Sequence, residues 1–371
     1  MPPDLSIIIP SRDRLWSLPK AVESCRSQKV KVQIIVIDDS SKDGTWDWLK
    51  SQPDVEAVAG EGWGKPWGVN KALALATGKY LRYLDSDDWL NPGANGMQFE
   101  IAEREQAEVV VAGLDIYQDA LGAHELGVPA LAGWDAPGSS TDAISRDAGC
   151  AAVPPAKAGT PNPALQERCP WVPTDDFIAQ QLGETPYSHY SAFLFRREFV
   201  KDIPHRTLFP ASDFASRDDR CFMLEVALRH PKIAVCGTPT LCHRHHGQGR
   251  LQFQGGFRGD GTNLQHFYIY KQVLTLLEER GELTQRRKKA AALIIWLLAH
   301  WIGYSHLEEA CEAAEWVHRL DPQFSVPESG LLGALYRRLG FRSTERLLRM
   351  RRALLAPFRR QPQRKRPQWP I

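Results

Sequence analysis

The sequence has no apolar run long enough to cross a bilayer and no cysteine framework. Its longest apolar stretch, Ala290 to Tyr304, is interrupted by His300 and is shorter than the roughly 20 residues of a membrane-spanning helix. The N-terminus lacks the basic segment and apolar core of a secretory signal. The seven cysteines follow no regular spacing, which excludes a small disulfide-stabilised scaffold and favours reduced thiols. We therefore expect a cytoplasmic protein that folds around a hydrophobic core.

Length and composition predict two parts of different character. The chain has 371 residues, of which 43% are hydrophobic, so it is long enough for two domains of ~150 residues each. The formal net charge is only +2, but the charge is unevenly placed. From Tyr336 to the end there are 12 Lys and Arg residues against one acid, Glu345. The C-terminal end is therefore strongly basic and the rest of the chain is mildly acidic.

The first 120 residues alternate between short apolar runs and helical patterns. The apolar runs predict strands at Leu5–Pro10, Val32–Ile37, Val55–Ala59, Tyr80–Leu84 and Val109–Tyr117. Helical patterns separate them, for example from Trp16 to Gln28 and from Gly68 to Ala76. Strands that alternate with helices indicate an α/β fold with a mainly parallel sheet covered on both faces.

The pattern changes twice after this alternation. Residues 120–175 are rich in Ala, Gly, Pro and Ser, which predicts a long irregular insertion that is either a functional loop or disordered. Order returns at His189–Val200, followed by a helix near Arg220 to Arg229 and a short strand at Ile233–Val235. Beyond residue 255 the pattern is helical, with breaks at Gly281 and near Asp321. We therefore expect one domain at residues 1–255 and a helical region at residues 256–371.

Acidic side chains follow two of the predicted strands. Asp85, Asp87 and Asp88 come directly after Tyr80–Leu84, and ligands of open parallel sheets bind at the carboxyl ends of strands. Acids packed this closely repel one another, and Mg²⁺ or Mn²⁺ would offset that cost while bridging to phosphates. The alternative is a solvated acidic turn that caps the next helix.

A second acidic pair, Asp38 and Asp39, ends the strand Val32–Ile37 at the same predicted edge. A carboxylate there can accept a hydrogen bond from a base N–H or a ribose hydroxyl. Helix capping by Asp39, Ser40 or Asp43 is the alternative.

These segments resemble the family 2 glycosyltransferases, the large inverting group with the GT-A fold. The matching segments are Ile7–Pro10, Val36–Thr45, Asn70, Ala76–Tyr80 and Leu84–Asp88. Weaker matches follow at Phe193–Arg197, Arg217–Asp219 and His243–His246. The resemblance covers roughly residues 4 to 250, and the helical remainder lies outside it.

The resemblance implies a site for a nucleoside-diphosphate-sugar. Asp39 would hold the nucleobase and Asp85 the ribose side, and the donor-binding set implied in this way is Pro10, Arg12, Asp39, Lys65, Asn70 and Asp85. Gly68-Val69-Asn70 stands where the family often has Ala-Arg-Asn, and Lys65 could take over the pyrophosphate contact of the missing arginine.

The same resemblance implies a metal and a base. Asp87 would bind Mn²⁺ or Mg²⁺ on the diphosphate, with Asp85 and His246 as further ligands. Asp218-Asp219 matches the family's Glu-Asp motif, so Asp219 is the first candidate for the base and Asp218 the second. Elementary chemistry agrees, since an acceptor hydroxyl needs a base and a leaving diphosphate needs positive charge.

The predicted function is inverting transfer of a sugar, with a UDP-sugar as the first choice of donor, to a hydroxyl of a saccharide or glycolipid. Surface polysaccharide or glycoconjugate biosynthesis would be the setting. One alternative is a sugar-nucleotide nucleotidyltransferase, which would carry a glycine-rich loop after the first strand, where this chain has Pro10 to Arg14. The other is a non-catalytic scaffold that retains the fold.

Three further features have rival interpretations. Cys236, Cys242 and the following histidines do not have the close spacing of structural zinc ligands, so buried thiols are favoured. Trp63 and Trp67 could stack on a ligand or pack in the core.

The third feature is the basic end of the chain, where leucines alternate with arginines from Arg346 to Arg360. This pattern predicts binding to an anionic membrane surface, which would place the protein at the inner face of the cytoplasmic membrane. A helix packed on the body is the second interpretation, and nucleic acid is the least favoured partner.

Overall fold

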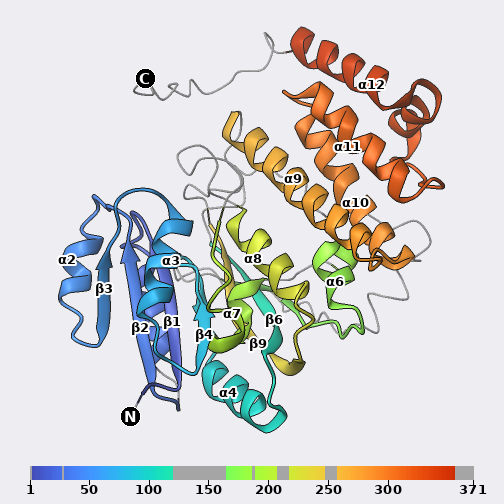
Figure 1. Cartoon of the computed structure of the whole chain (residues 1–371). Helices are drawn as coiled ribbons and strands as arrows, with labels where there is room; N and C mark the ends of the chain where they lie inside the picture. The colour runs from blue at the N-terminus through green and yellow to red at the C-terminus, as the bar shows by residue number, and fades with distance from the viewer. Residues whose placement is uncertain are drawn as a thin grey trace.

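The computed structural model describes residues 2–26, 29–119, 164–185, 189–206, 217–246 and 257–355. One twisted sheet with helices on its faces occupies the N-terminal part, and the helices that follow residue 257 gather beyond the end of the sheet opposite to β3 (Figure 1).

The first half of the sheet is parallel, as the sequence predicts. Its order is β3-β2-β1-β4, formed by β1 (Leu5–Ser11), β2 (Val32–Asp38), β3 (Val55–Ala59) and β4 (Tyr80–Tyr83). The connecting helices are α1 (Leu18–Arg26), α2 (Thr45–Lys50) and α3 (Lys65–Leu75). β1 is buried almost throughout and pairs in parallel with both β2 and β4, which explains why it reads as a continuous apolar run.

The second half of the sheet is mixed. The order continues β8-β6-β9-β5, through β5 (Trp89–Leu90), β6 (Val109–Gln118), β8 (Leu194–Arg196) and β9 (Ile233–His245). β8 runs antiparallel to both β4 and β6, and β5 runs antiparallel to β9. β9 is far longer than the predicted strand Ile233–Val235, because a register shift between Ala112 and Leu114 of β6 lets the pairing continue past Gly237 and Pro239.

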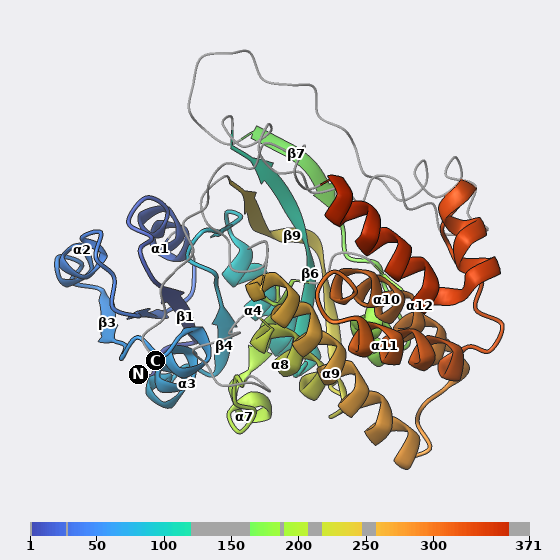
Figure 2. The same ribbon diagram turned by 90° about the horizontal axis from the view of Figure 1, so that it is seen from above.

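Part of the segment predicted to be irregular is a strand. β7 (Ala164–Cys169) pairs antiparallel with β6, so the prediction of an irregular 120–175 is wrong at this point. Arg168 fixes the pairing by donating from Nε to Oδ1 of the buried Asp115 at 2.9 Å. β7 extends the sheet beside β6, as the view from above shows (Figure 2). Residues 120–163 lie outside the described residues.

Short helices complete the N-terminal part. They are α4 (Ala94–Glu105), α6 (Phe177–Ala179), the π-helical turn η1 (Gln180–Glu184), the 3₁₀ turn η2 (Tyr190–Ala192), α7 (Arg197–Val200) and α8 (Asp218–Ala227). The buried face of α8 includes Cys221, Phe222 and Leu224, and Phe222 packs against Tyr83 of β4 and Phe195 of β8.

The C-terminal region is helical, as predicted. It consists of α9 (Phe257–Glu279), α10 (Gln285–Ile302), α11 (Leu307–Leu320) and α12 (Gly330–Leu355). Its core centres on Trp296 of α10, which contacts Phe324, Tyr336 and Phe341. Within the described residues, none of the helices combines the length and the apolar character needed to span a membrane.

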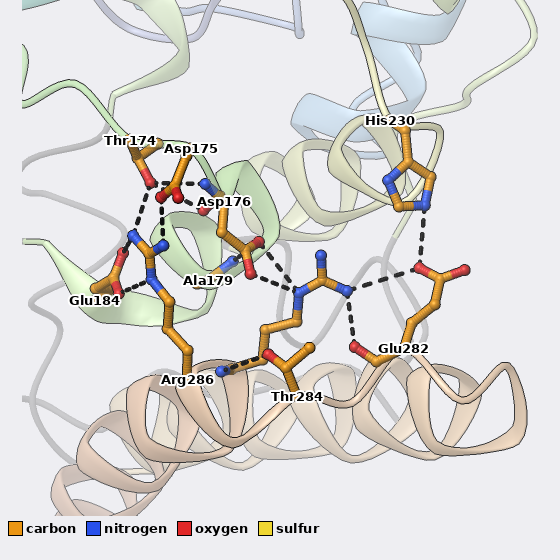
Figure 3. A network of polar contacts seen from close by, with 10 residues as sticks. Thr174, Asp175, Asp176, Ala179, Glu184, His230, Glu282, Thr284 and Arg286 are labelled. Atoms are coloured by element: carbon orange, nitrogen blue, oxygen red, sulfur yellow. Dashed lines mark hydrogen bonds and ion pairs between the residues drawn. The ribbon is translucent and has the colours of Figure 1, made fainter.

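Two arginines at the start of α10 connect this region to the N-terminal part (Figure 3). Nε of Arg287 lies 3.1 and 2.9 Å from the two carboxylate oxygens of Asp176, and both side chains are largely buried. Asp176 also accepts the N–H of Ala179 at 2.9 Å and so caps α6. Arg286 pairs with Asp175 and Glu184 at a more exposed position. Burial should make the Arg287 pair the stronger link.

We expect Arg287→Ala to destabilise the protein by roughly 2–4 kcal/mol, because it leaves the buried carboxylate of Asp176 without its cation. Arg286→Ala is the matched control at an exposed pair and should cost less than about 1 kcal/mol. Urea unfolding of both variants measures the difference. Equal losses would contradict the assignment of Arg287 as the main link.

Candidate functional site

The predicted acidic residues gather where β1, β2 and β4 end. Ser11 pairs with Asp38 in the register of β1 and β2, and Ile8 pairs with Tyr83, so the carboxyl ends of all three strands lie at one edge. The site is built from the loops that follow these strands. This is where ligands of such sheets bind.

Asp38 and Asp39 have different surroundings. Asp38 accepts hydrogen bonds from the backbone and side chain of Ser41, so it shapes the turn. Asp39 accepts the N–H of Gly64 at 3.0 Å and lies 3.7 Å from a guanidinium nitrogen of the exposed Arg12. A Cβ at residue 60 would lie 3.0 Å from Oδ1 of Asp39, so the close approach of the two loops requires Gly60. Asp38 therefore stabilises the turn, and neither aspartate caps α2, which has no side-chain cap.

Asp85 forms an ion pair with Lys65, the first residue of α3. Nζ of Lys65 lies 2.8 Å from Oδ1 of Asp85, and each side chain is less than a quarter exposed. Burial alone would lower the pKa of Lys65, but Asp85 and, further away, Asp218 and Asp219 outweigh it and raise this pKa. Lys65 is therefore a fixed positive charge among carboxylates from distant parts of the chain.

Asp87 faces His246, the residue directly after β9. Nε2 of His246 lies 2.9 Å from Oδ2 of Asp87, and a guanidinium nitrogen of Arg14 lies 3.8 Å from the same oxygen. His246 is buried against Trp16, and its Nδ1 has no hydrogen-bond partner among the described residues. A carboxylate and an imidazole in contact offer ligand atoms for a divalent metal ion.

Asp88 belongs to a second group that offers ligand atoms. Asp88, His189 and His243 present one such atom each within 4.8 Å of one another. Hydrogen bonds account for this group, because Asp88 accepts the N–H of Arg244 at 2.8 Å and lies 3.1 Å from Nδ1 of His243. His189 accepts the N–H of Ser191 at Nδ1, so in the neutral ring Nε2 carries the proton and is not a metal donor. Burial and the neighbouring His243 lower the pKa of His189, which favours this neutral ring.

Asp218 is buried behind the site. Its Oδ2 accepts from Nδ1 of His205 at 2.8 Å, and both side chains are almost fully buried. His205 is held in turn by Asn70, which donates to its carbonyl at 2.6 Å and accepts its N–H at 2.8 Å. The amide of Asn70 thus joins α3 to the segment before α8, and its contact with a donor stays a prediction.

Asp219, the next residue, is half-buried. Its Oδ1 accepts the N–H of Arg220 at 2.8 Å. Burial alone would raise the pKa of Asp219, but the charges of Lys65, Arg217 and Arg220 outweigh it and lower this pKa. The carboxylate is therefore ionised at neutral pH.

Sequence reasoning missed two residues of this site and left one pair open. No local motif marks His189, which lies 4.0 Å from Asp88, or His205, which contacts Asp218. Trp63 and Trp67 are 57% and 51% exposed, so core packing does not explain them, and contact with a ligand stays a prediction. Pro10 is half-buried near the end of β1.

Comparison with known families matches the segment that carries these loops. Residues 6–138 match the model of the glycosyl transferase family 2. This segment belongs to the glycosyl transferase family 2. The match contains Asp39, Lys65, Asp85 and Asp87, whereas Asp219 and His246 lie beyond it.

Curated relatives agree with this identification. The succinoglycan biosynthesis protein ExoO of Rhizobium meliloti is 30% identical over 118 residues, which cover 31% of this chain and 34% of the relative. The Escherichia coli protein WfaP, named as a UDP-Glc:α-D-GlcNAc-diphosphoundecaprenol β-1,3-glucosyltransferase, is 37% identical over 89 residues, 23% of this chain and 36% of the relative. The chain thus spans about a third of the length of the curated relatives it matches.

Solved structures extend the likeness in fold over most of the chain. The crystal structure of Staphylococcus aureus TarS 1–349 with UDP-GlcNAc matches with a TM-score of 0.57, covering 93% of this chain and 91% of that one. The identity is 15%, so the likeness shows the fold alone. The fold of the glycosyltransferase domain is of the GT-A type, as the sequence predicts.

We expect Asp218→Ala to lower the free energy of unfolding by about 1–3 kcal/mol, because it leaves the buried Nδ1 of His205 unpaired. Asp219→Ala, at the neighbouring half-buried position, is the control and should cost less. Urea unfolding monitored by circular dichroism measures both. A smaller loss for Asp218→Ala than for Asp219→Ala would contradict the buried pair.

Proposed function

We propose that this protein transfers a sugar with inversion from a nucleoside-diphosphate-sugar to a hydroxyl of a saccharide or lipid-linked acceptor. A UDP-sugar is the first choice of donor. The observation that carries the proposal is that Asp39 binds Gly64 and Asp85 binds Lys65 at the carboxyl edge of the sheet, where the charge of Lys65 also lowers the pKa of Asp219.

The names of the relatives support the choice of substrates. WfaP takes UDP-Glc and a diphosphoundecaprenol-linked sugar. A Campylobacter jejuni relative, 32% identical over 114 residues, is named as a β-1,3-glucosyltransferase that acts on GalNAc(5)-diNAcBac-PP-undecaprenol. A lipid-linked acceptor in polysaccharide biosynthesis, reached from the cytoplasmic side of the membrane, is therefore part of the proposal.

Asp219 is the proposed base. It is the acid of its pair whose pKa the neighbouring cations lower, whereas Asp218 is committed to His205. An ionised carboxylate is a weak base in water, but it serves when the proton moves late, as the acceptor hydroxyl acidifies during attack on the anomeric carbon. Asp218 and His205 would act only by positioning the start of α8.

Lys65 and Asp39 are the proposed donor contacts. Nζ of Lys65 supplies the positive charge that an arginine gives in many relatives, and the departing diphosphate would take over its contact with Asp85. Asp39 would accept a hydrogen bond from the nucleobase with the oxygen that Gly64 leaves available.

Asp87 and His246 are the proposed metal ligands, with Asp85 as the third. Oδ2 of Asp87 and Nε2 of His246 lie 2.9 Å apart. A site with an imidazole ligand fits Mn²⁺ better than Mg²⁺, which prefers oxygen ligands alone. The ion would supply positive charge to the diphosphate of the donor.

The test of the function is release of nucleoside diphosphate from UDP-, GDP- and dTDP-sugars in the presence of Mn²⁺. We expect release from one class of donor, and Asp219→Asn should lower turnover ~10²-fold or more with donor affinity nearly unchanged. Lys42→Gln, in the loop after Asp39 but without an assigned role, is a control for surface charge. Full turnover by Asp219→Asn would place the base elsewhere, and no release from any donor would remove the proposal.

The metal has a separate test. Asp87→Ala and His246→Ala should both weaken binding of Mn²⁺, measured by calorimetry on the protein without donor, and chelation should abolish turnover. His189→Ala is the matched control from the second group and should leave the affinity for Mn²⁺ unchanged. If His189→Ala removes the ion and His246→Ala does not, the ion lies at Asp88 instead.

A further inference from the structure

The last described helix, α12, has one face buried against the helical region and one face exposed to solvent. A left-handed Gly340 (φ 75°) divides α12, and its second segment runs from Phe341 to Leu355. The inner face of this segment packs on the helical region through polar contacts. Glu345 is fully buried, accepts from the hydroxyl of Tyr336 at 2.6 Å and lies 3.1 Å from Nδ1 of His300. Arg352 stacks its guanidinium 3.7 Å from the ring centre of Tyr304.

These contacts fix the rotation of the segment about its axis. Thr344 is also fully buried, and Phe341 and Leu348 pack against the core from the same side. Arg342, at one edge, reaches α11 and contacts Glu308 at 2.5 Å. The segment cannot turn its other face inward without breaking the buried contacts of Glu345.

The outer face is apolar although it lies in solvent. Leu347, Met350 and Leu354 are 45%, 61% and 71% exposed. Their spacing of three and four residues places them in one stripe along the helix. Arg346 and Arg351, both exposed, lie on opposite sides of this stripe. The only acid of residues 330–355 is Glu345, which points inward.

We propose that the outer face of this segment binds an anionic lipid surface. An apolar stripe between arginines is typical of a helix that lies in the plane of the lipid headgroups, with its apolar side chains below them and its cations on the phosphates. This partner deepens the proposed function, because a lipid-linked acceptor lies in the same surface.

Other occupants fit the face less well. A second copy would meet it in a two-fold contact, which sets the same arginines against one another with no acid on the face to offset them. A nucleic acid would use the arginines but gains nothing from the exposed leucines and methionine. Charge and apolarity together therefore favour lipid.

The experiment is co-sedimentation of the full chain with vesicles of phosphatidylcholine, with and without phosphatidylglycerol. We expect binding to the anionic vesicles, much weaker binding to the neutral ones, and loss of binding as salt is raised. The triple variant Leu347→Asn, Met350→Asn and Leu354→Asn should bind at least about tenfold more weakly. The pair Arg346→Gln and Arg351→Gln should lose about fivefold per arginine.

Matched controls use exposed residues of the glycosyltransferase domain. Leu75→Asn, 39% exposed, and Arg104→Gln, on an exposed side chain of α4, should bind vesicles like the unaltered chain. All substituted positions are exposed, so the thermal midpoint of each variant should be unchanged. Vesicle binding that survives in the outer-face variants would overturn the proposal. The proposal would also be overturned if the chain did not bind vesicles and the outer-face variants instead abolished a dimer or the binding of RNA.

The failure of this inference and of the proposed function are distinguishable. Donor hydrolysis in solution without vesicles should be unchanged in the outer-face variants. If the chain binds vesicles through this face but releases no nucleoside diphosphate, the proposed function fails and the lipid surface stands. If the chain hydrolyses donor but does not bind vesicles, the lipid-binding proposal fails and the proposed function stands.

Discussion

The positive charge of Lys65 is the constraint on which the candidate site depends. Carboxylates that approach one another in a partly buried site repel, and each would otherwise take up a proton or move apart. Nζ of Lys65 contacts Asp85 at 2.8 Å and lowers the pKa of Asp219, which the chain brings from more than a hundred residues away. The same charge thus stabilises both Asp85, the proposed donor contact, and Asp219, the proposed base. When a donor binds, its diphosphate would contact Lys65 in place of Asp85.

Hydrogen bonds hold this charge in place. Lys65 begins α3, and Gly64 before it is fixed by its hydrogen bond to Asp39. One turn later, Asn70 holds the backbone of His205, which pairs with Asp218 at the start of α8. A continuous set of contacts therefore connects Asp39, the proposed nucleobase contact, through α3 to the proposed base. Displacing any of these residues should shift the geometry of the two sides together.

The sequence predicts the parts of this arrangement that are local. A buried strand followed by acids is readable at Asp38 and at Asp85, because the apolar run and the polar turn are contiguous. The contacts of His189 and His205 are not readable, because loops bring them to the acids and no periodicity marks a loop. The length of β9 was missed for a related reason, since Gly237 and Pro239 look like the end of a strand unless the register shift in β6 is known.

In the helical region, the sequence predicts a helix but not which of its faces packs against the protein. The alternation of leucine and arginine after Arg346 leaves two interpretations open, a helix packed on the body and a helix on a membrane. The structure shows that the segment packs through Glu345, Thr344 and Leu348, and that Leu347, Met350 and Leu354 remain outside. The two interpretations therefore describe opposite faces of one helix and do not exclude each other. Because Arg287 and Asp176 join α10 to the N-terminal part, a surface that binds α12 would also restrict how the candidate site faces that surface.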